Sequence, residues 1–235
     1  MKRFTATAAS EIRARKGATV PGFMDVLLLQ DQNEAHSLSP LQRKRNLFFK
    51  RSVDIFFSSI LILLVFSWLL PVIAILIRMD SRGPVFFLQQ RHKKGGKLFT
   101  CIKFRTMVVN EEADTRPSFR DDHRITRFGR FLRKNYLDEL PQLLNVLRGD
   151  MSLIGPRPYM VSENEKYART IADYHFRHSV KPGMTGLAQS TGHFGFLANS
   201  AEMRQRLSLD EAYIRNWTIM MDLRIMCRTV KLMIS

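Results

Sequence analysis

The sequence predicts a mainly helical α+β protein, with one hydrophobic membrane helix followed by a small domain that holds a β-hairpin and amphipathic interfacial helices. An uncharged run over residues 55–77 is long enough for a membrane helix. β-Favouring runs on both sides of Lys93-Lys94-Gly95-Gly96 predict the hairpin. Helical periodicity then dominates from about residue 122.

Three segments are expected along the chain. They are a weakly structured leader over residues 1–45, a basic-flanked membrane helix over 46–80, and a cytoplasmic domain over 81–235. The net charge of +16 points to an anionic partner, which can be nucleic acid, an acidic membrane surface or a phosphorylated small molecule. The two cysteines, Cys101 and Cys227, form no Cys-x-x-Cys pattern, so neither a zinc site nor a disulfide framework is expected.

The hydrophobic segment can either span the membrane or dip into it and return. Length alone favours an ordinary span. Both flanks are rich in lysine and arginine, however, and the positive-inside rule then favours a re-entrant helix with both ends on one face. Pro71 lies inside the segment, and Ser67 lies four residues before it, where a hydroxyl can bond back to a carbonyl. We therefore expect a kink near Ser67 and Pro71.

The second hairpin strand carries two cations. Lys103 and Arg105 alternate with Ile102 and Phe104, so they are expected on one strand face. A solvated face and a face directed at an anion are equally compatible with this pattern.

Two adjacent carboxylates, Asp138 and Glu139, precede an apolar helical stripe in an arginine-rich region. The simplest interpretation makes Asp138 the N-cap of that helix, with Pro141 in the first turn. A single cap explains one carboxylate better than two. The alternative is a site in which Asp138 is a nucleophile or a metal ligand and the nearby arginines hold a phosphate.

Two later segments add weaker indications. Arg157 stands between Pro156 and Pro158, whose fixed φ restrains the backbone around it, and this suits bidentate phosphate recognition as well as a stiff exposed turn. The apolar C-terminal stretch over residues 214–234 is equally compatible with an interfacial helix and with a core helix.

Together, the motifs "GPVFF", "KFRTM", "RITRFGRFLRK", "LDELPQLLNVLRGDMSLIGPRP" and "KPGMTGLAQ" resemble the bacterial sugar transferase family. These are polyprenyl-phosphate phosphoglycosyl transferases that begin exopolysaccharide, capsule or glycan assembly. The resemblance runs from about Lys50 to the C-terminus and looks like the small, monotopic form. It implies transfer of a sugar-1-phosphate from a UDP-sugar to undecaprenyl phosphate at the cytoplasmic face of the inner membrane, with release of UMP.

The resemblance also implies roles for particular residues. Asp138 matches the nucleophile that forms a phosphosugar-enzyme intermediate, and Glu139 matches the position that assists catalysis and Mg²⁺ binding. Both carboxylates are thus the expected Mg²⁺ ligands. The expected phosphate-binding residues are Arg133, Arg157, Lys103 and Arg105.

The chain departs from the family pattern in two places. Ser67 is followed by Trp68 rather than by proline, so the kink can be displaced. His193-Phe194 stands where many members have an arginine after the glycine, so a phosphate or sugar contact there is not carried over in full.

Three other classes compete with this interpretation. A membrane-tethered nucleic-acid-binding protein would account for the charge but needs no carboxylate pair, and no nucleic-acid partner is expected. A catalytically idle scaffold of the same fold has no need of the dyad either. A conventional metal-dependent glycosyltransferase is disfavoured because the chain has no Asp-x-Asp pair.

Overall fold

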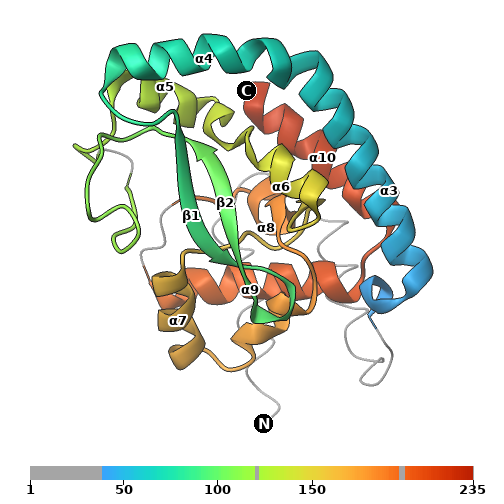
Figure 1. The fold of residues 1–235 in the computed structure, drawn as a ribbon. Helices are drawn as coiled ribbons and strands as arrows, with labels where there is room; N and C mark the ends of the chain where they lie inside the picture. The colour runs from blue at the N-terminus through green and yellow to red at the C-terminus, as the bar shows by residue number, and fades with distance from the viewer. Residues whose placement is uncertain (1–38, 120–121, 196–198, 235) are drawn as a thin grey trace. The chain divides into compact units, whose positions relative to one another are not determined.

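A bent apolar helix is the first long element of the structure, a computed structural model that describes residues 39–119, 122–195 and 199–234 (Figure 1). Helix α3 (Lys44–Leu61) passes through a π-helical turn (Ile62–Phe66) into α4 (Ser67–Asp80). By length and composition this continuous helix could cross a membrane. Only 17% of its most apolar stretch is buried by the rest of the protein. As predicted, one helix among the described residues is long and apolar enough to cross a membrane.

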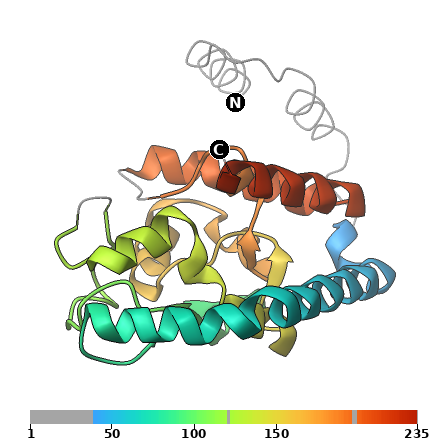
Figure 2. The same ribbon diagram turned by 90° about the horizontal axis from the view of Figure 1, so that it is seen from above.

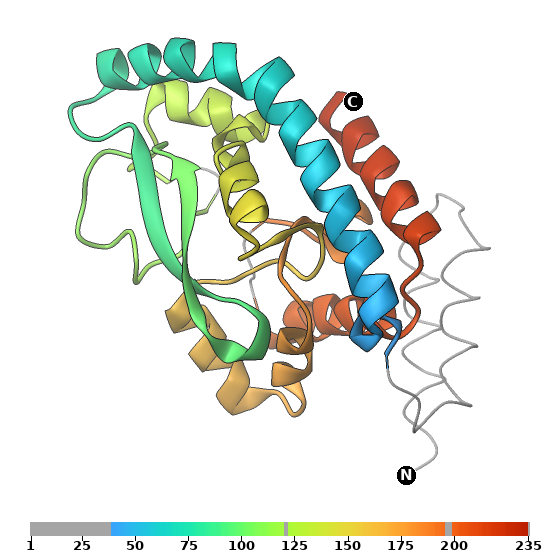
Figure 3. The ribbon, with the colours of Figure 1, turned by 45° about the vertical axis from the view of Figure 1, so that its right-hand side comes forward.

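The axis of this helix changes direction between α3 and α4 (Figures 1 and 3). The hydroxyl of Ser67 donates to the carbonyl of Leu63 at 2.7 Å, and the indole of Trp68 donates to that of Leu64 at 2.8 Å. Pro71 follows inside α4, where it has no N–H to give. The π-helical turn and this proline are both recognised causes of helix bending. A re-entrant path through the bilayer stays a prediction.

The predicted hairpin is confirmed. Strands β1 (Phe86–His92) and β2 (Leu98–Phe104) pair antiparallel. Gly95 and Gly96 in the connecting turn have φ of 75° and 72°, which favours glycine over other residues.

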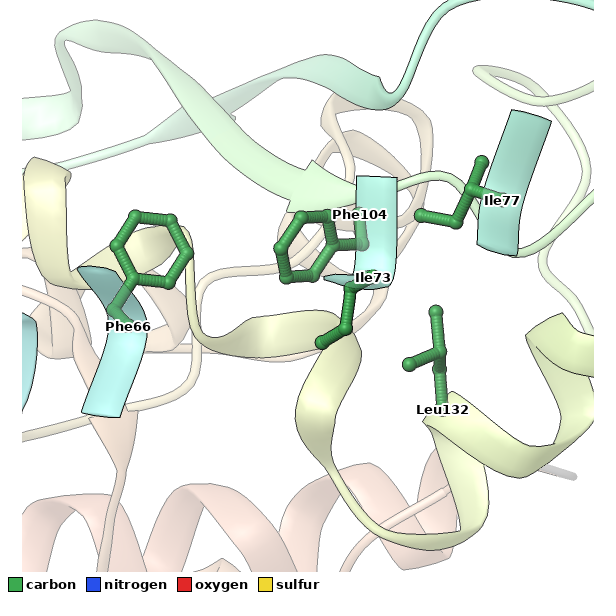
Figure 4. Packing of buried hydrophobic residues seen from close by; sticks show 5 residues of the cluster. All are labelled: Phe66, Ile73, Ile77, Phe104 and Leu132. Carbon is green, nitrogen blue, oxygen red and sulfur yellow. The ribbon is translucent and has the colours of Figure 1, made fainter. Parts of the chain in front are cut away.

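An apolar cluster joins the membrane helix to the rest of the domain (Figure 4). Phe66, Ile73 and Ile77 of the helix pack with Phe104 of β2 and Leu132 of α5, and all five side chains are buried. Three of these five buried side chains thus come from a helix that is otherwise mostly exposed, and they hold the helix against the hairpin.

The remaining elements are short helices around a small parallel pair of strands, β3 (Ser152–Ile154) and β4 (Gly183–Thr185). The helices are α5 (Arg127–Lys134), α6 (Gln142–Arg148), α7 (Val161–Thr170), α8 (Leu187–Ser190), α9 (Ser200–Arg215) and α10 (Ile219–Ile234), with 3-10 turns at Pro40–Gln42, Lys94–Gly96, Leu137–Glu139 and Tyr174–Ser179.

Two predicted boundaries differ from the structure. Helix α5 begins at Arg127 rather than near Asp122, because Asp122 and Arg124 form a buried ion pair (2.6 Å) in the preceding loop. The expected leader lies outside the described residues up to residue 38, and its last part is ordered, with Leu41 buried and the Ser39 hydroxyl bonded to the carbonyl of Ile214 at 2.6 Å.

Candidate active site

The two carboxylates lie on the 3-10 turn Leu137–Glu139 between α5 and α6. Tyr136, just before the turn, has φ of 56°, in a left-handed region that non-glycine residues seldom adopt. Helix α6 begins only after Pro141, and no side chain caps it. The expectation that Asp138 is an N-cap is therefore wrong, because the helix starts later than the apolar pattern indicated. Capping does not account for this carboxylate.

The same turn is anchored on the membrane helix. Leu137 and Leu140, on either side of the dyad, pack against the cluster that contains Phe66 and Ile73. The dyad is thereby positioned beside the segment where the helix bends.

Glu139 is held by two cations from distant parts of the chain. Its Oε1 accepts from Nζ of Lys103 at 2.7 Å and from Nη2 of Arg157 at 2.7 Å, and its Oε2 accepts from Nη1 of Arg157 at 3.3 Å. Burial opposes ionisation of Glu139, but Arg157 and Lys103 outweigh it, and the pKa is lowered. Glu139 therefore stays ionised at neutral pH and anchors both cations.

Asp138 is the less constrained member of the pair. Within the described part of the chain, no donor forms a hydrogen bond or ion pair with its carboxylate. Burial raises the pKa of Asp138, and the charge of Glu139 raises it further, while Lys103, Arg133 and Arg157 partly offset this effect. A half-buried carboxylate that is surrounded by cations but bonded to none keeps its oxygens available to attack an electrophile or to bind a metal ion.

Arg157 reaches Glu139 from a loop with very close backbone packing. A Cβ on Gly183 would lie 2.1 Å from the backbone nitrogen of Gly155, and one on Gly186 would lie 2.2 Å from its carbonyl oxygen. Only glycine allows these two loops to approach so closely. Arg177 then donates to the carbonyl of Arg157 at 2.6 Å. The close loop packing and this hydrogen bond thus hold the backbone of Arg157 in place.

Arg133 is positioned by α5. A Cβ on Gly129 would lie 2.1 Å from the carbonyl oxygen of Thr106, so glycine allows α5 to pack directly against the backbone that follows β2. The Arg133 guanidinium donates to the hydroxyls of Thr106 (2.8 Å) and Ser118 (2.7 Å), and it lines the same cavity as the dyad. Its role in phosphate binding stays a prediction.

Arg105 lines the same cavity as the dyad but forms its hydrogen bonds elsewhere. Its guanidinium donates to the carbonyls of Ser81 (2.7 Å) and Arg82, just after the end of α4. Lys103 and Arg105 therefore have different partners: Lys103 donates to Glu139, whereas Arg105, one residue past β2, donates to backbone carbonyls. A phosphate-binding role for Arg105 stays a prediction.

A cavity of about 1570 Å³ contains the dyad together with Lys103, Arg133 and Arg157. This exceeds the usual volume of a pocket for one small ligand, which is roughly 300–1000 Å³. Phe194 also lines it, with its ring edge-on to Tyr136 at a centroid distance of 6.2 Å. A contact from His193 to a phosphate or sugar stays a prediction.

The donor chemistry fits Mg²⁺ bound together with a diphosphate. Asp138 and Glu139 offer hard oxygen ligands, and among the described residues no group of three or more His, Cys, Asp or Glu side chains gathers for a metal. Mg²⁺ commonly binds through one or two carboxylates and completes its shell with water and substrate phosphates. The site therefore suits a metal that is shared with the substrate.

Several supporting residues could not be identified from the sequence, among them Thr106, Ser118 and Arg177. Asp54 could have been identified from the sequence, because an acidic residue in an apolar membrane helix is energetically costly unless it has a partner. Its carboxylate accepts from the hydroxyl of Ser152 (2.9 Å) and the backbone N–H of Leu153 (3.0 Å). Asp54 thereby fixes β3, which leads directly to the Arg157 loop.

The described residues include one helix that is long and apolar enough to cross a membrane and a half-buried carboxylate pair among cations, and the sequence comparisons assign the family. The model of the bacterial sugar transferase family matches residues 45–235, and the chain belongs to this family. It is 46% identical over 186 residues to the UDP-glucose:undecaprenyl-phosphate glucose-1-phosphate transferase of Klebsiella pneumoniae, a match that covers 79% of this chain and 40% of that protein.

Two further relatives are matched over more of their own length. A UDP-glucose:undecaprenyl-phosphate glucose-1-phosphate transferase of Caulobacter vibrioides is 44% identical over 182 residues, covering 77% of this chain and 68% of that protein. The exopolysaccharide production protein PSS of Rhizobium leguminosarum is 43% identical over 190 residues, covering 79% and 94%. The chain thus spans less than half of the Klebsiella relative but nearly all of the Rhizobium one.

Proposed function

We propose that the protein transfers a sugar-1-phosphate from a UDP-sugar to a polyprenyl phosphate, with undecaprenyl phosphate as the acceptor, and releases UMP. The names of the relatives support the donor and acceptor classes. Those names differ in the sugar, which is glucose, N-acetylgalactosamine or galactose, so the proposal extends only to the UDP-sugar class. The reaction would initiate assembly of an exopolysaccharide, capsule or glycan at the cytoplasmic face of the inner membrane.

The observation that carries the proposal is the contrast between the two carboxylates. Glu139 accepts three hydrogen bonds from Lys103 and Arg157, which leaves part of its acceptor capacity for a metal ion, whereas Asp138 has no hydrogen-bonding partner among the residues described. In the first half-reaction, an oxygen of Asp138 attacks the phosphorus that carries the sugar, the bond from that phosphorus to UMP breaks, and UMP leaves. In the second, a phosphate oxygen of the lipid attacks the same phosphorus and releases Asp138. Two half-reactions let one site serve a soluble donor and a lipid acceptor in turn.

The cations around the dyad support each half-reaction. Attack by a carboxylate on a diphosphate brings anions together, and preorganised arginines lower this repulsion. Arg157 and Lys103, held by Glu139, and Arg133, held by α5, are the groups that would bind the phosphates. Mg²⁺ bound by Asp138 and Glu139 would supply additional charge neutralisation at the diphosphate.

The experiment uses purified protein in membranes with undecaprenyl phosphate, Mg²⁺ and a panel of UDP-sugars, and it measures UMP. We expect sustained UMP release with at least one sugar only when the lipid phosphate is present. Release of UDP instead of UMP, or no release with any donor by folded protein, would contradict the proposal.

A further inference from the structure

Part of the wall of the active-site cavity is apolar and comes from two helices. Leu61 of α3 and Val65 of the π-helical turn line one side, and Met226, Val230 and Met233 of α10 line the other. The three α10 residues follow at intervals of four and three, so they share one helix face. The view in Figure 2 shows α10 and the α3–α4 helix along opposite sides of the domain, with the strands between them.

The α10 wall is held in place by buried polar contacts. At its first turn, Asp222 accepts from Lys50 of α3 (2.7 Å), from the hydroxyl of Tyr213 (2.8 Å) and from the indole of Trp217 (3.0 Å). Further along, the hydroxyl of Thr229 lies 2.8 Å from that of Thr185 at the end of β4. The apolar face of α10 is therefore fixed relative to both the membrane helix and the loop that carries Arg157.

The apolar part of the wall is continuous with the surface that would meet the lipid. Leu63 and Leu64, one turn along from Leu61, are 71% and 69% exposed, as expected for side chains in contact with a bilayer. The dyad and its cations line the same cavity. A single cavity thus combines charged groups suited to a phosphate with apolar side chains from the membrane helix and α10.

We propose that the first isoprene units of the acceptor lipid bind between Leu61 and Val65 on one side and Met226, Val230 and Met233 on the other. This inference rests on the proposed function, because it assigns a place to the chain of that acceptor. A phosphate bound near the dyad presents its attached isoprenoid chain to this apolar wall, while the polar sugar and uridine gain nothing from it. The large cavity volume allows both parts to be held.

The test compares two methionines of α10 that are both exposed to similar extents. Met233 lines the cavity, whereas Met220, on the first turn of the helix, does not. With undecaprenyl phosphate, Met233→Ser is expected to raise the KM for the acceptor at least about threefold through lost apolar contact, and Met220→Ser is not. The KM for the UDP-sugar is expected to stay unchanged in both variants. Geranyl phosphate, which keeps the first isoprene units, is expected to show a similar difference between the variants.

Photocrosslinking gives a measurement that does not depend on turnover. A polyprenyl phosphate with a photoreactive group in its first isoprene units is expected to label peptides that contain Met226 or Met233. Labelling confined to the outer face of α4, or equal effects of the Met220 and Met233 substitutions on every acceptor, would overturn the inference and indicate general contact with bilayer lipid. Absence of product from wild type with every acceptor, combined with labelling of α10, would refute the proposed function while retaining the lipid site.

Discussion

Replacement of Glu139 by glutamine removes the charge that two buried cations share. Lys103 and Arg157 both donate to this carboxylate, at 2.7 Å each for the shortest contacts, and their side chains are 13% and 29% exposed. The amide of glutamine keeps one acceptor oxygen, but it directs an N–H group at one of the cations. The variant is therefore expected to be destabilised.

The size of the effect follows from the bonds lost. Each hydrogen bond to a charged group contributes about 1.5–3 kcal/mol, and Glu139→Gln weakens about two of them. Water can reach part of Arg157, which reduces the loss, so we expect the free energy of unfolding to fall by about 2 kcal/mol. For a domain of this size, that corresponds to a decrease in Tm of about 4–8 °C.

Asp138→Asn serves as the matched control on the neighbouring residue. Burial raises the pKa of Asp138, so its ionised form is disfavoured by folding, and stability linked to this group is lost as pH rises through the folded-state pKa. The neutral amide avoids that loss, so Asp138→Asn is expected to keep or raise the Tm at neutral pH. Glu139 has a lowered pKa, so its contribution is present above the ordinary pKa of about 4.3 and declines only below it.

The assay is thermal unfolding of the detergent-solubilised proteins, followed by circular dichroism from pH 2 to 8. The wild-type and Glu139→Gln curves are expected to differ by a constant amount above about pH 4.3 and to converge below it. Equal Tm values for wild type and Glu139→Gln at pH 7, or a decrease in Asp138→Asn as large as that in Glu139→Gln, would refute the assignment of Glu139 as the anchor.

Three other predictions concern pH, the end of α4 and topology. The kcat/KM for UMP release is expected to fall on the acid side with a midpoint above the ordinary aspartate pKa of about 3.9, because Asp138 must be ionised to react; a constant value down to pH 4 would contradict this. Arg105→Gln is expected to lower stability by about 2 kcal/mol in thermal unfolding, because the guanidinium donates to two backbone carbonyls, whereas a raised KM for UDP-sugar at unchanged Tm would show that Arg105 acts mainly in phosphate binding. The topology is tested with Ser39→Cys and Ser162→Cys, each in a Cys227→Ser background. Both cysteines are expected to resist an impermeant thiol reagent in intact cells and to react with it after permeabilisation. Labelling of Ser39→Cys alone in intact cells would indicate a full span.

The sequence alone was sufficient to predict the elements that depend on local patterns of residues. The apolar run, the hairpin around Gly95-Gly96 and the amphipathic helices follow from composition and periodicity within short windows. The motifs were likewise sufficient to identify the family, because the resemblance covers most of the chain.

The features that depend on long-range contacts could not be predicted in the same way. The contact between Lys103 and Glu139 spans 36 positions, and that between Ser152 and Asp54 spans 98. Arg105 stands two residues after Lys103, yet its guanidinium donates to the carbonyls of Ser81 and Arg82 just after α4. These hydrogen bonds depend on how the helix packs on the hairpin, which local sequence does not reveal. The capping interpretation of Asp138 failed for a local reason, since a 3-10 turn precedes the helix.

The most direct test of the central claim is protein labelling by a UDP-sugar that carries its label in the sugar, with Mg²⁺ and without lipid acceptor. If Asp138 is the nucleophile, wild type acquires covalent label, mass spectrometry places it on the peptide that contains Asp138, and polyprenyl phosphate discharges it. Asp138→Asn, which is expected to fold as well as wild type, acquires none. Near-normal turnover by folded Asp138→Asn, or label on a peptide without Asp138, would contradict the account.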